Sequence, residues 1–378
     1  MRIAVQNPQW ICTTDSCRIH DYGVDFLRLY RPVIYLSRPD YRRALMAFLK
    51  AKGLERRDFR IVYTTRGLRR HADVLVCFNG APHVGPHRPV RQFDGLKIYH
   101  VMDYTVDAGA VNAALEAGGV DYVMAYSYLD RYDSFFRAQY PRYEGRVLNV
   151  PFGFHPRFTV TTSFAERRNK CVALGAVNPV RDPLLAETRL KEFGAHFADE
   201  EWAHKFRRLL VENADRLGDV MDSTLPVFPE TKNTGFDMNA MMNAYRMFVS
   251  CESILYFPSA KTFEGPATGT VMVCSDHACN RVLGFVGGDN CIMHRECDVD
   301  HFRDQVAFYI AHPEKLEAIH ETGTRFVRSE YSHEAVARKL YDDIAAVYAG
   351  REPGVWTQRF AARKEAGACI SSPIAVGG

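Results

Sequence analysis

Short apolar runs alternate with helix-like stretches along the first half of the chain. The runs place apolar residues at consecutive positions rather than at every second one, which is typical of parallel strands buried on both faces. The expected strands are Arg2–Val5, Val33–Leu36, Arg60–Tyr63, Val74–Cys77, Lys97–Val101, Asp121–Ala125 and Arg146–Val150. Helices are expected between them, for example over Tyr41–Lys52 and Ala108–Ala117. This alternation predicts a doubly wound α/β domain.

A second alternating set follows in the other half of the chain. Its expected strands are Lys170–Leu174, Ser253–Phe257 and Thr270–Ser275. Its expected helices are a stretch around Glu200–Glu212, Met238–Val249, a short helix from about Thr262, Val299–Ile310, and two more that follow. Asp298 can cap Val299–Ile310, Pro313 can open the next helix, and Ser332 can cap the last.

The segment Pro151–Pro156 separates the two sets, because two prolines and a glycine interrupt the rhythm. We expect an N-terminal lobe over residues 1–155, a C-terminal lobe over residues 156–332, and a last helix and tail over residues 333–378 that can pack back on the N-terminal lobe. Two Rossmann-like lobes place the carboxyl ends of their strands across a cleft, and ligands bind at such ends.

Composition agrees with this organisation and excludes several functions. The length of 378 residues suits two domains, and the formal net charge of +3 is too small for a nucleic-acid-binding protein. Runs such as Arg56-Arg57 and Arg69-Arg70 are solvated faces or, alternatively, a weak peripheral contact with an anionic membrane. No apolar run reaches the roughly 20 residues of a membrane span, and the N-terminus lacks the apolar core of a secretory signal, so a cytoplasmic location is expected.

The ten cysteines include no CxxC pair. Cys274, His277 and Cys279 lie close together in sequence and are followed by Cys291, His294 and Cys297, which leaves a zinc site as an alternative. Their spacing does not fit such a site, and Cys274 ends an apolar strand, where cysteine behaves as a small hydrophobic residue. We therefore expect buried free thiols and no metal.

The segment from Leu255 to Val273 predicts a strand, a turn, a short helix, a glycine and a second strand. Glu264 lies in the first turns of that helix, where a carboxylate can accept hydrogen bonds from the two hydroxyls of a ribose. The amides at the helix start, with Lys261 and Thr262, can bind a diphosphate. The alternative is a surface carboxylate that only complements the helix dipole.

This segment resembles a signature of retaining-type glycosyltransferases of the GT-B architecture. Lys261, Thr262, Phe263 and Glu264, followed by Gly265, Ala267 and Gly269, are similar to the pattern R/K-x-F-E-x-x-A-x-G. The similarity is closest to the CgeB-like branch and spans roughly residues 240–348, through stretches similar to the family at 284–291, 312–314 and 330–332. The resemblance implies a nucleotide-sugar donor on the C-terminal lobe, with Glu264 on the ribose. Many relatives carry a glutamate where this chain has Tyr256, so the stereochemical outcome stays open.

Further donor-binding residues follow from the same resemblance. Gly175, Asn178 and Arg181 stand in a stretch similar to the family's loop after the first strand of the second lobe. The resemblance implies that the glycine lets the backbone approach the phosphates and that Arg181 binds them, since a guanidinium offers paired donors. The alternative for Arg181 is a surface salt bridge with Asp182 or Glu187.

The N-terminal lobe offers candidates for the acid–base chemistry. Asp103 follows the strand Lys97–Val101 and is the leading candidate to accept the acceptor's proton or to orient the acceptor; His100 and His20 come next. Each histidine could instead be a core residue, and Asp103 could cap a turn.

Together these observations predict a hexosyltransferase-type enzyme of polysaccharide biosynthesis. It would move a sugar from a UDP- or GDP-sugar to a glycan, a lipid-linked or another hydroxyl acceptor, with no cofactor and no metal. The alternatives are a nucleotide-sugar epimerase and a non-catalytic nucleotide-sugar- or glycan-binding protein. A nicotinamide enzyme is disfavoured because no GxGxxG follows the first strand.

Overall fold

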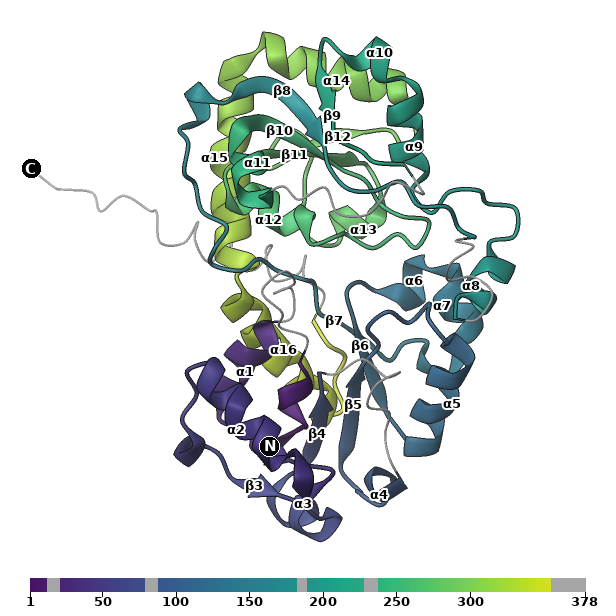
Figure 1. The fold of residues 1–378 in the computed structure, drawn as a ribbon, viewed down its shortest axis with the longest axis vertical. Helices are drawn as coiled ribbons and strands as arrows, with labels where there is room; N and C mark the ends of the chain where they lie inside the picture. Colours follow the sequence, from purple (N-terminus) through teal and green to yellow (C-terminus); the bar gives the residue numbers. More distant parts are fainter. Residues whose placement is uncertain (12–20, 79–87, 182–188, 228–236, 355–378) are drawn as a thin grey trace, which may run out of the picture.

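The computed structural model describes residues 1–11, 21–78, 88–181, 189–227 and 237–354. Two α/β lobes lie one above the other, each built on one parallel sheet (Figure 1). This confirms the predicted architecture of two Rossmann-like lobes. Within the described ranges, no helix has the length and apolar character needed to cross a membrane.

The N-terminal lobe contains a seven-stranded sheet in the order β3-β2-β1-β4-β5-β6-β7, in which every neighbouring pair is parallel. Its strands are β1 (Ile3–Gln6), β2 (Val33–Tyr35), β3 (Ile61–Val62), β4 (Val74–Cys77), β5 (Leu96–His100), β6 (Tyr122–Ala125) and β7 (Val147–Asn149). Its helices are α1 (Tyr22–Tyr30), α2 (Arg42–Ala51), α3 (Thr65–His71), α4 (Arg88–Arg91), α5 (Ala108–Gly118), α6 (Leu129–Tyr132) and α7 (Ser134–Gln139). Short 3-10 turns are η1 (Pro8–Trp10), η2 (Pro39–Tyr41), η3 (Arg56–Asp58), η4 (Pro141–Tyr143) and, after the lobe, η5 (Phe164–Glu166).

The second lobe contains a five-stranded parallel sheet in the order β12-β11-β10-β8-β9. Its strands are β8 (Arg168–Ala173), β9 (Met221–Ser223), β10 (Tyr245–Ser250), β11 (Val271–Ser275) and β12 (Ile292–His294). The helices from here to the end of the described chain are α8 (Lys191–His196), α9 (Lys205–Glu212), α10 (Ala214–Leu217), α11 (Met238–Ala244), α12 (Lys261–Ala267), α13 (Ala278–Arg281), α14 (Val299–Ala311), α15 (Pro313–Glu330) and α16 (His333–Tyr348). The predicted caps Asp298 and Ser332 are confirmed, since each side chain accepts a backbone N–H of the first turn, and Pro313 opens α15.

The prediction around the middle strand of the second sheet was wrong. The expected helix Met238–Val249 ends at Ala244, and its second half is the strand β10. The expected strand Ser253–Phe257 is a loop. Asp237 caps α11 through its carboxylate, and the aromatic and β-branched residues that follow Ala244 favour a strand. The apolar residues of α11 and β10 run together without a turn residue between them, so periodicity alone did not separate the two elements.

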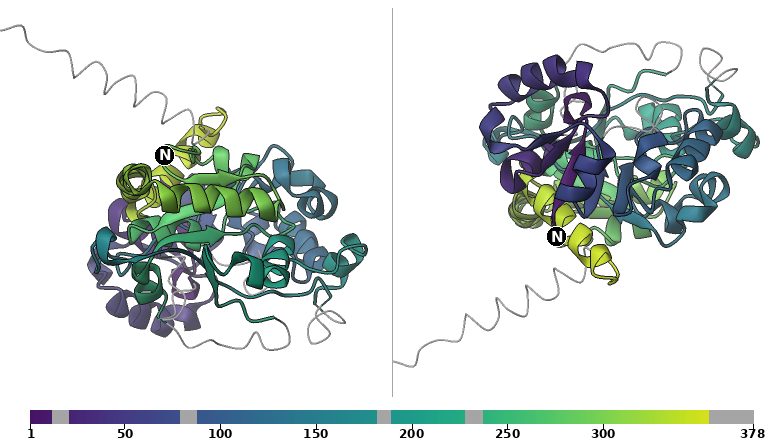
Figure 2. Two further views of the ribbon diagram at one scale, coloured as in Figure 1. Left: turned by 90° about the horizontal axis from the view of Figure 1, so that it is seen from above. Right: turned by 90° about the horizontal axis from the view of Figure 1, so that it is seen from below.

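Two connections besides the linker join the lobes. The helix α16 crosses from the C-terminal lobe and packs against α1 (Figures 1 and 2), where the rings of Tyr30 and Tyr341 stack with centroids 4.0 Å apart. The segment that contains α8 reaches the N-terminal lobe from the other side. There Arg189 forms an ion pair of 3.0 Å with Asp107, and apolar residues of α8 join the core of the N-terminal lobe.

The helix α15 holds the loop after α13 by a close approach that requires glycine. A Cβ atom on Gly323 would lie 2.5 Å from the backbone oxygen of Asn290. We expect Gly323→Ala to lower the free energy of unfolding by about 1–3 kcal/mol despite alanine's higher helix propensity, because the backbone of the loop must shift. Urea unfolding followed by circular dichroism measures this change.

Gly109→Ala in α5 is the matched control, because a Cβ there would meet only the Glu192 Oε1 atom, at 3.5 Å. We expect that variant to be as stable as the wild type or slightly more stable. Equal effects of the two substitutions would contradict the assigned contact.

Candidate functional site

A glycine and two cationic side chains meet at the carboxyl edge of the second sheet. Gly175 follows β8 with a φ of +121°, a conformation that favours glycine. A Cβ atom at this position would lie 3.0 Å from the guanidinium of Arg207 and 3.4 Å from the Nζ atom of Lys261. Only a glycine therefore allows both cations to reach this backbone. We call Gly175, Arg207 and Lys261 the cation cradle.

Arg207 is fixed in the cradle by the backbone around it. It lies in the first turn of α9 and is 5% exposed. Its Nη1 donates to the carbonyl of Ala176 at 2.9 Å and its Nη2 to that of Cys251 at 3.4 Å, whereas Nε has no hydrogen-bond partner among the described residues. Burial lowers the pKa of the guanidinium. Its hydrogen bonds go to neutral carbonyls, and Glu252 acts on it only from beyond ion-pair distance, so the buried cation lacks an anion in direct contact among the described residues.

Lys261 is the first residue of α12 and is partly exposed. Removal from water and the neighbouring Arg207 lower the pKa of its ammonium to about 8, although Glu264 opposes this shift. Within the described ranges neither Lys261 nor Arg207 has a carboxylate at ion-pair distance. Two like charges side by side without an anion repel each other, so the cradle has the electrostatics of an anion site.

Glu264 lies one turn further along α12. Burial raises the pKa of its carboxyl to about 7, and this shift is opposed by Lys261 and by Arg157 of the linker. No donor among the described residues forms a hydrogen bond with its carboxylate. Such a side chain can accept two hydroxyl donors from a ligand without first losing a protein partner.

The other residues predicted on α12 hold the helix rather than face the cradle. The Thr262 hydroxyl lies 2.9 Å from that of Ser250, and Phe263 is fully buried. A Cβ on Gly265 would lie 2.2 Å from the ring of Phe248, so this glycine allows α12 to approach β10. The amides of Thr262 and Phe263 donate to carbonyls of the preceding turn and are not available to a ligand.

Arg207 occupies the position beside the glycine loop that the sequence assigned to Arg181. The guanidinium of Arg181 donates to the carbonyl of Ala198 at 3.2 Å on an exposed surface. Asn178 accepts the amide of Ala203 at its carbonyl. One signal for Arg207 was present in the sequence: it lies three residues before Leu210, on the same face of α9, and both side chains are buried.

The three acid–base candidates of the N-terminal lobe have different surroundings. His100 ends β5 and is fully buried, with its ring against that of Tyr126 at 5.0 Å. Asp103 is exposed, in a left-handed turn with a φ of 49°. His20 lies outside the described residues. Of the two described candidates, Asp103 presents its side chain to solvent.

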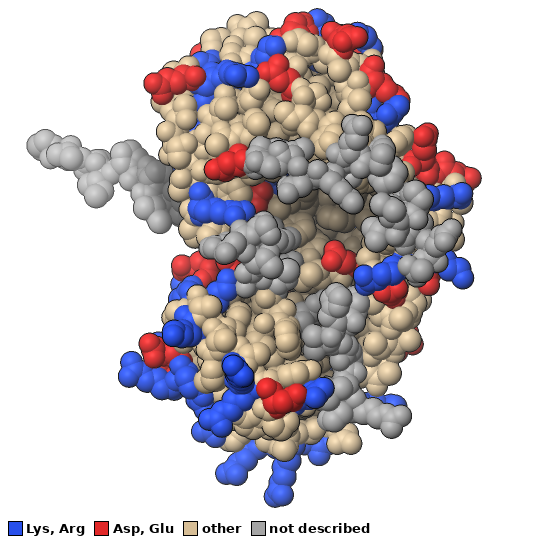
Figure 3. All heavy atoms as spheres, viewed as in Figure 1, with Lys and Arg blue, Asp and Glu red and all other residues tan. Residues whose placement is uncertain are grey.

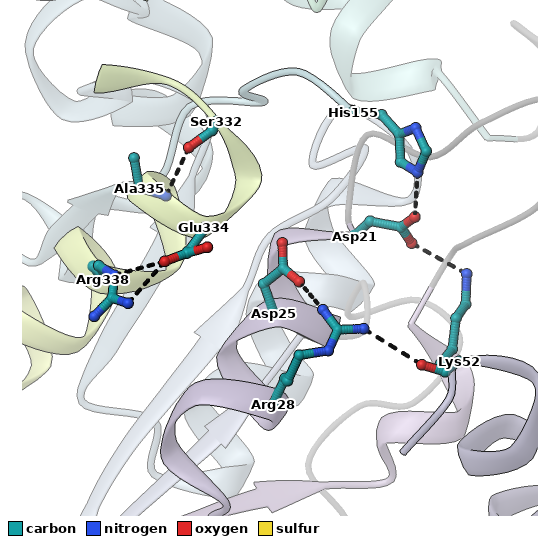
Figure 4. A network of polar contacts seen from close by, with 9 residues as sticks. All are labelled: Asp21, Asp25, Arg28, Lys52, His155, Ser332, Glu334, Ala335 and Arg338. Carbon is teal, nitrogen blue, oxygen red and sulfur yellow. Dashed lines mark hydrogen bonds and ion pairs between the residues drawn. The ribbon is translucent and has the colours of Figure 1, made fainter. Parts of the chain in front are cut away.

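A network of charged residues follows His20 at the junction of linker and N-terminal lobe (Figure 4). Asp21 contacts Lys52 at 3.3 Å and His155 of the linker at 3.5 Å. Asp25 pairs with Arg28 one turn along α1. These residues line a pocket of about 510 Å³ that the start of α16 closes on another side. The network ties the linker to α1.

The described residues contain no group of three or more His, Cys, Asp or Glu side chains placed to hold a metal ion. Of the cysteines in the zinc alternative, Cys274, Cys279 and Cys291 are buried free thiols, whereas Cys297 is exposed, so the expectation of buried thiols was wrong for Cys297. Burial and the nearby Cys291 thiol raise the pKa of Cys274.

Comparison with known proteins identifies the second lobe. Residues 187–342 match the family described as "Glycosyl transferase-like". The structure of Anabaena HepE in complex with UDP superposes with a TM-score of 0.50 and 10% sequence identity, covering 91% of this chain and 100% of HepE. HepE in complex with UDP and glucose gives the same score and identity over 92% of this chain and 100% of HepE. Sucrose-phosphate synthase from Thermosynechococcus elongatus has a TM-score of 0.49 and 11% identity, with 93% of this chain and 100% of that chain covered.

A search of curated protein sequences gives no match. The HepE structures agree with this chain over both lobes, which establishes the GT-B fold. The family match includes Arg207, Lys261 and Glu264. The chain therefore has the GT-B fold, and its residues 187–342 match a glycosyltransferase-like family.

Proposed function

We propose that the protein transfers a sugar from a UDP- or GDP-sugar to a hydroxyl group of a glycan, lipid-linked or other acceptor. The observation that carries this proposal is the cation cradle, in which Arg207 and Lys261 meet at Gly175 without a carboxylate partner among the described residues. A diphosphate supplies the missing negative charge, and the two hydroxyls of its ribose suit Glu264. HepE, which has the same fold, is known in complex with UDP, which supports this choice of ligand.

In the proposed reaction, the bond between the anomeric carbon and the diphosphate oxygen breaks, and its electron pair leaves with the diphosphate. The two cations stabilise that developing charge. Since they supply two positive charges, the proposal includes no divalent metal. The acceptor oxygen forms the new bond and loses its proton, for which Asp103 is the leading candidate, followed by His100 and His20. The CgeB-like branch remains the proposed subfamily.

Substitutions in the cradle test the proposal. We expect Arg207→Gln and Lys261→Met each to raise the dissociation constant for UDP about 10–100-fold, because each removes a charge-assisted contact with phosphate. Arg181→Gln is the control and should change the constant less than about twofold, as expected for an exposed arginine. Isothermal titration calorimetry measures the constants, and thermal unfolding shows whether each variant is folded. Loss of affinity in Arg181→Gln with normal affinity in Arg207→Gln would restore the assignment made from sequence.

The pH dependence of donor binding provides a second test. With UDP-glucose, whose phosphates do not titrate near neutral pH, affinity should fall below about pH 7 as Glu264 gains a proton and above about pH 8 as Lys261 loses one. The optimum therefore lies between these values. Glu264→Gln should weaken binding and flatten the acidic limb alone, and Lys261→Met the alkaline limb alone. A profile unchanged by both substitutions would contradict the assignment.

We further propose that the enzyme works in the cytoplasm with a peripheral contact to an anionic membrane. Lys and Arg gather on the lower and left parts of the N-terminal lobe (Figure 3). Six exposed arginines of α2, α3 and the turn between them form no ion pair within the described ranges: Arg42, Arg43, Arg56, Arg57, Arg66 and Arg70. At low salt the protein should sediment with vesicles that contain phosphatidylglycerol. At roughly 0.5 M NaCl it should stay in the supernatant, because the salt screens the charges. Equal binding to neutral phosphatidylcholine vesicles would contradict this contact.

A further inference from the structure

A second, small pocket lies next to the cation cradle. The ends of β10, β11 and β12 and the start of α9 form it, and its volume of about 30 Å³ has room for roughly two water molecules. Ser275 and His294 are register neighbours on adjacent strands, and both line the pocket with Glu252. Glu252 also raises the pKa of Arg207, which shows that the pocket and the cradle are close neighbours.

The buried imidazole of His294 presents a hydrogen-bond acceptor. His294 is 1% exposed, and its Nδ1 lies 2.7 Å from the carbonyl oxygen of Arg295. Because a carbonyl only accepts, Nδ1 carries the proton and Nε2 has a free lone pair. Nε2 has no hydrogen-bond partner among the described residues. Burial lowers the pKa of the ring to about 4, so it is neutral under physiological conditions.

Two carboxylates give the pocket a negative character. Glu252 accepts the Nδ2 group of Asn280 at 2.5 Å but has no ion-pair partner among the described residues, and burial raises its pKa. Glu296 is exposed and also lines the pocket. Lys205, the only lysine or arginine among the described residues of the lining, already pairs with Glu200 at 2.6 Å. The pocket therefore offers acceptors and negative charge to a group of small size.

We propose that this pocket binds the primary ammonium group of an amine-bearing sugar, with Glu252, Ser275 and His294 Nε2 as its three acceptors. An ammonium carries three donors and no acceptor, and it is about as large as a water molecule. A neutral hydroxyl would use fewer of these acceptors and would bring no positive charge to Glu252, on which Arg207 acts only from beyond ion-pair distance. This assignment rests on the proposed function, because it places the amine on the donor sugar or on the acceptor sugar of the proposed reaction.

Binding measurements with matched sugars test the assignment. In the donor arm, UDP-glucosamine should bind at least about tenfold more tightly than UDP-glucose, as expected for a charge-assisted contact. In the acceptor arm, with UDP present, glucosamine should bind more tightly than glucose. The arm that shows the preference identifies which sugar carries the amine. Calorimetry measures the first arm, and saturation-transfer NMR the second.

Glu252→Gln should abolish the preference for the amine and leave the affinity for UDP equal to that of the wild type or slightly higher, since it removes a negative charge near Arg207. Glu296→Gln, at an exposed position, should reduce the preference in part. Asp289→Asn is the charge control, because that exposed residue does not line the pocket, and it should keep the preference.

Two results would overturn the assignment: no preference for the amine in either arm, or a preference that survives Glu252→Gln. Binding of UDP distinguishes a failure of this assignment from a failure of the proposed function. If UDP does not bind, glucosamine and glucose are compared without nucleotide, and equal signals from the two sugars would then exclude an ammonium site as well.

Discussion

The site depends on one electrostatic constraint: two cations are held side by side at a backbone that leaves no room for a side chain. Gly175 makes this approach possible, and the carbonyls of Ala176 and Cys251 fix the guanidinium of Arg207. Carbonyl dipoles orient a cation but do not neutralise it. The free energy of this arrangement therefore improves when an anion enters, which links the stability of the site to its occupancy.

Most of the fold could be predicted from the sequence, because parallel strands buried on both faces leave continuous apolar runs. All seven strands expected in the N-terminal lobe are present, with each end shifted by at most one residue. The middle strand β10 was missed, since α11 runs into it without a glycine or proline. The short strands β9 and β12, three residues each, gave too little pattern to be recognised.

The candidate site was only partly predictable. Gly175, Lys261 and Glu264 were named from the sequence, and the structure brings the first two to one place with Glu264 one turn away. Arg207 was missed, because it stands about thirty residues after the glycine loop and reaches it only through tertiary structure. Three other residues of the motif fix α12 against β10 and do not face the cradle: Thr262, Phe263 and Gly265. A motif therefore identifies a helix more reliably than it identifies which side chains bind.

The connection between the lobes bears directly on the cradle. The segment with α8 docks on the N-terminal lobe through Arg189 and Asp107, and the amide of Ile254 then donates to Ala203, just before α9 begins. The chain thus runs from the α8 segment, which is anchored to the N-terminal lobe, through Ala203 into α9, where Arg207 lies. Any change in the angle between the lobes must either break these contacts or move the start of α9. The position of Arg207, which we propose to bind the diphosphate, is therefore coupled to the angle between the lobes.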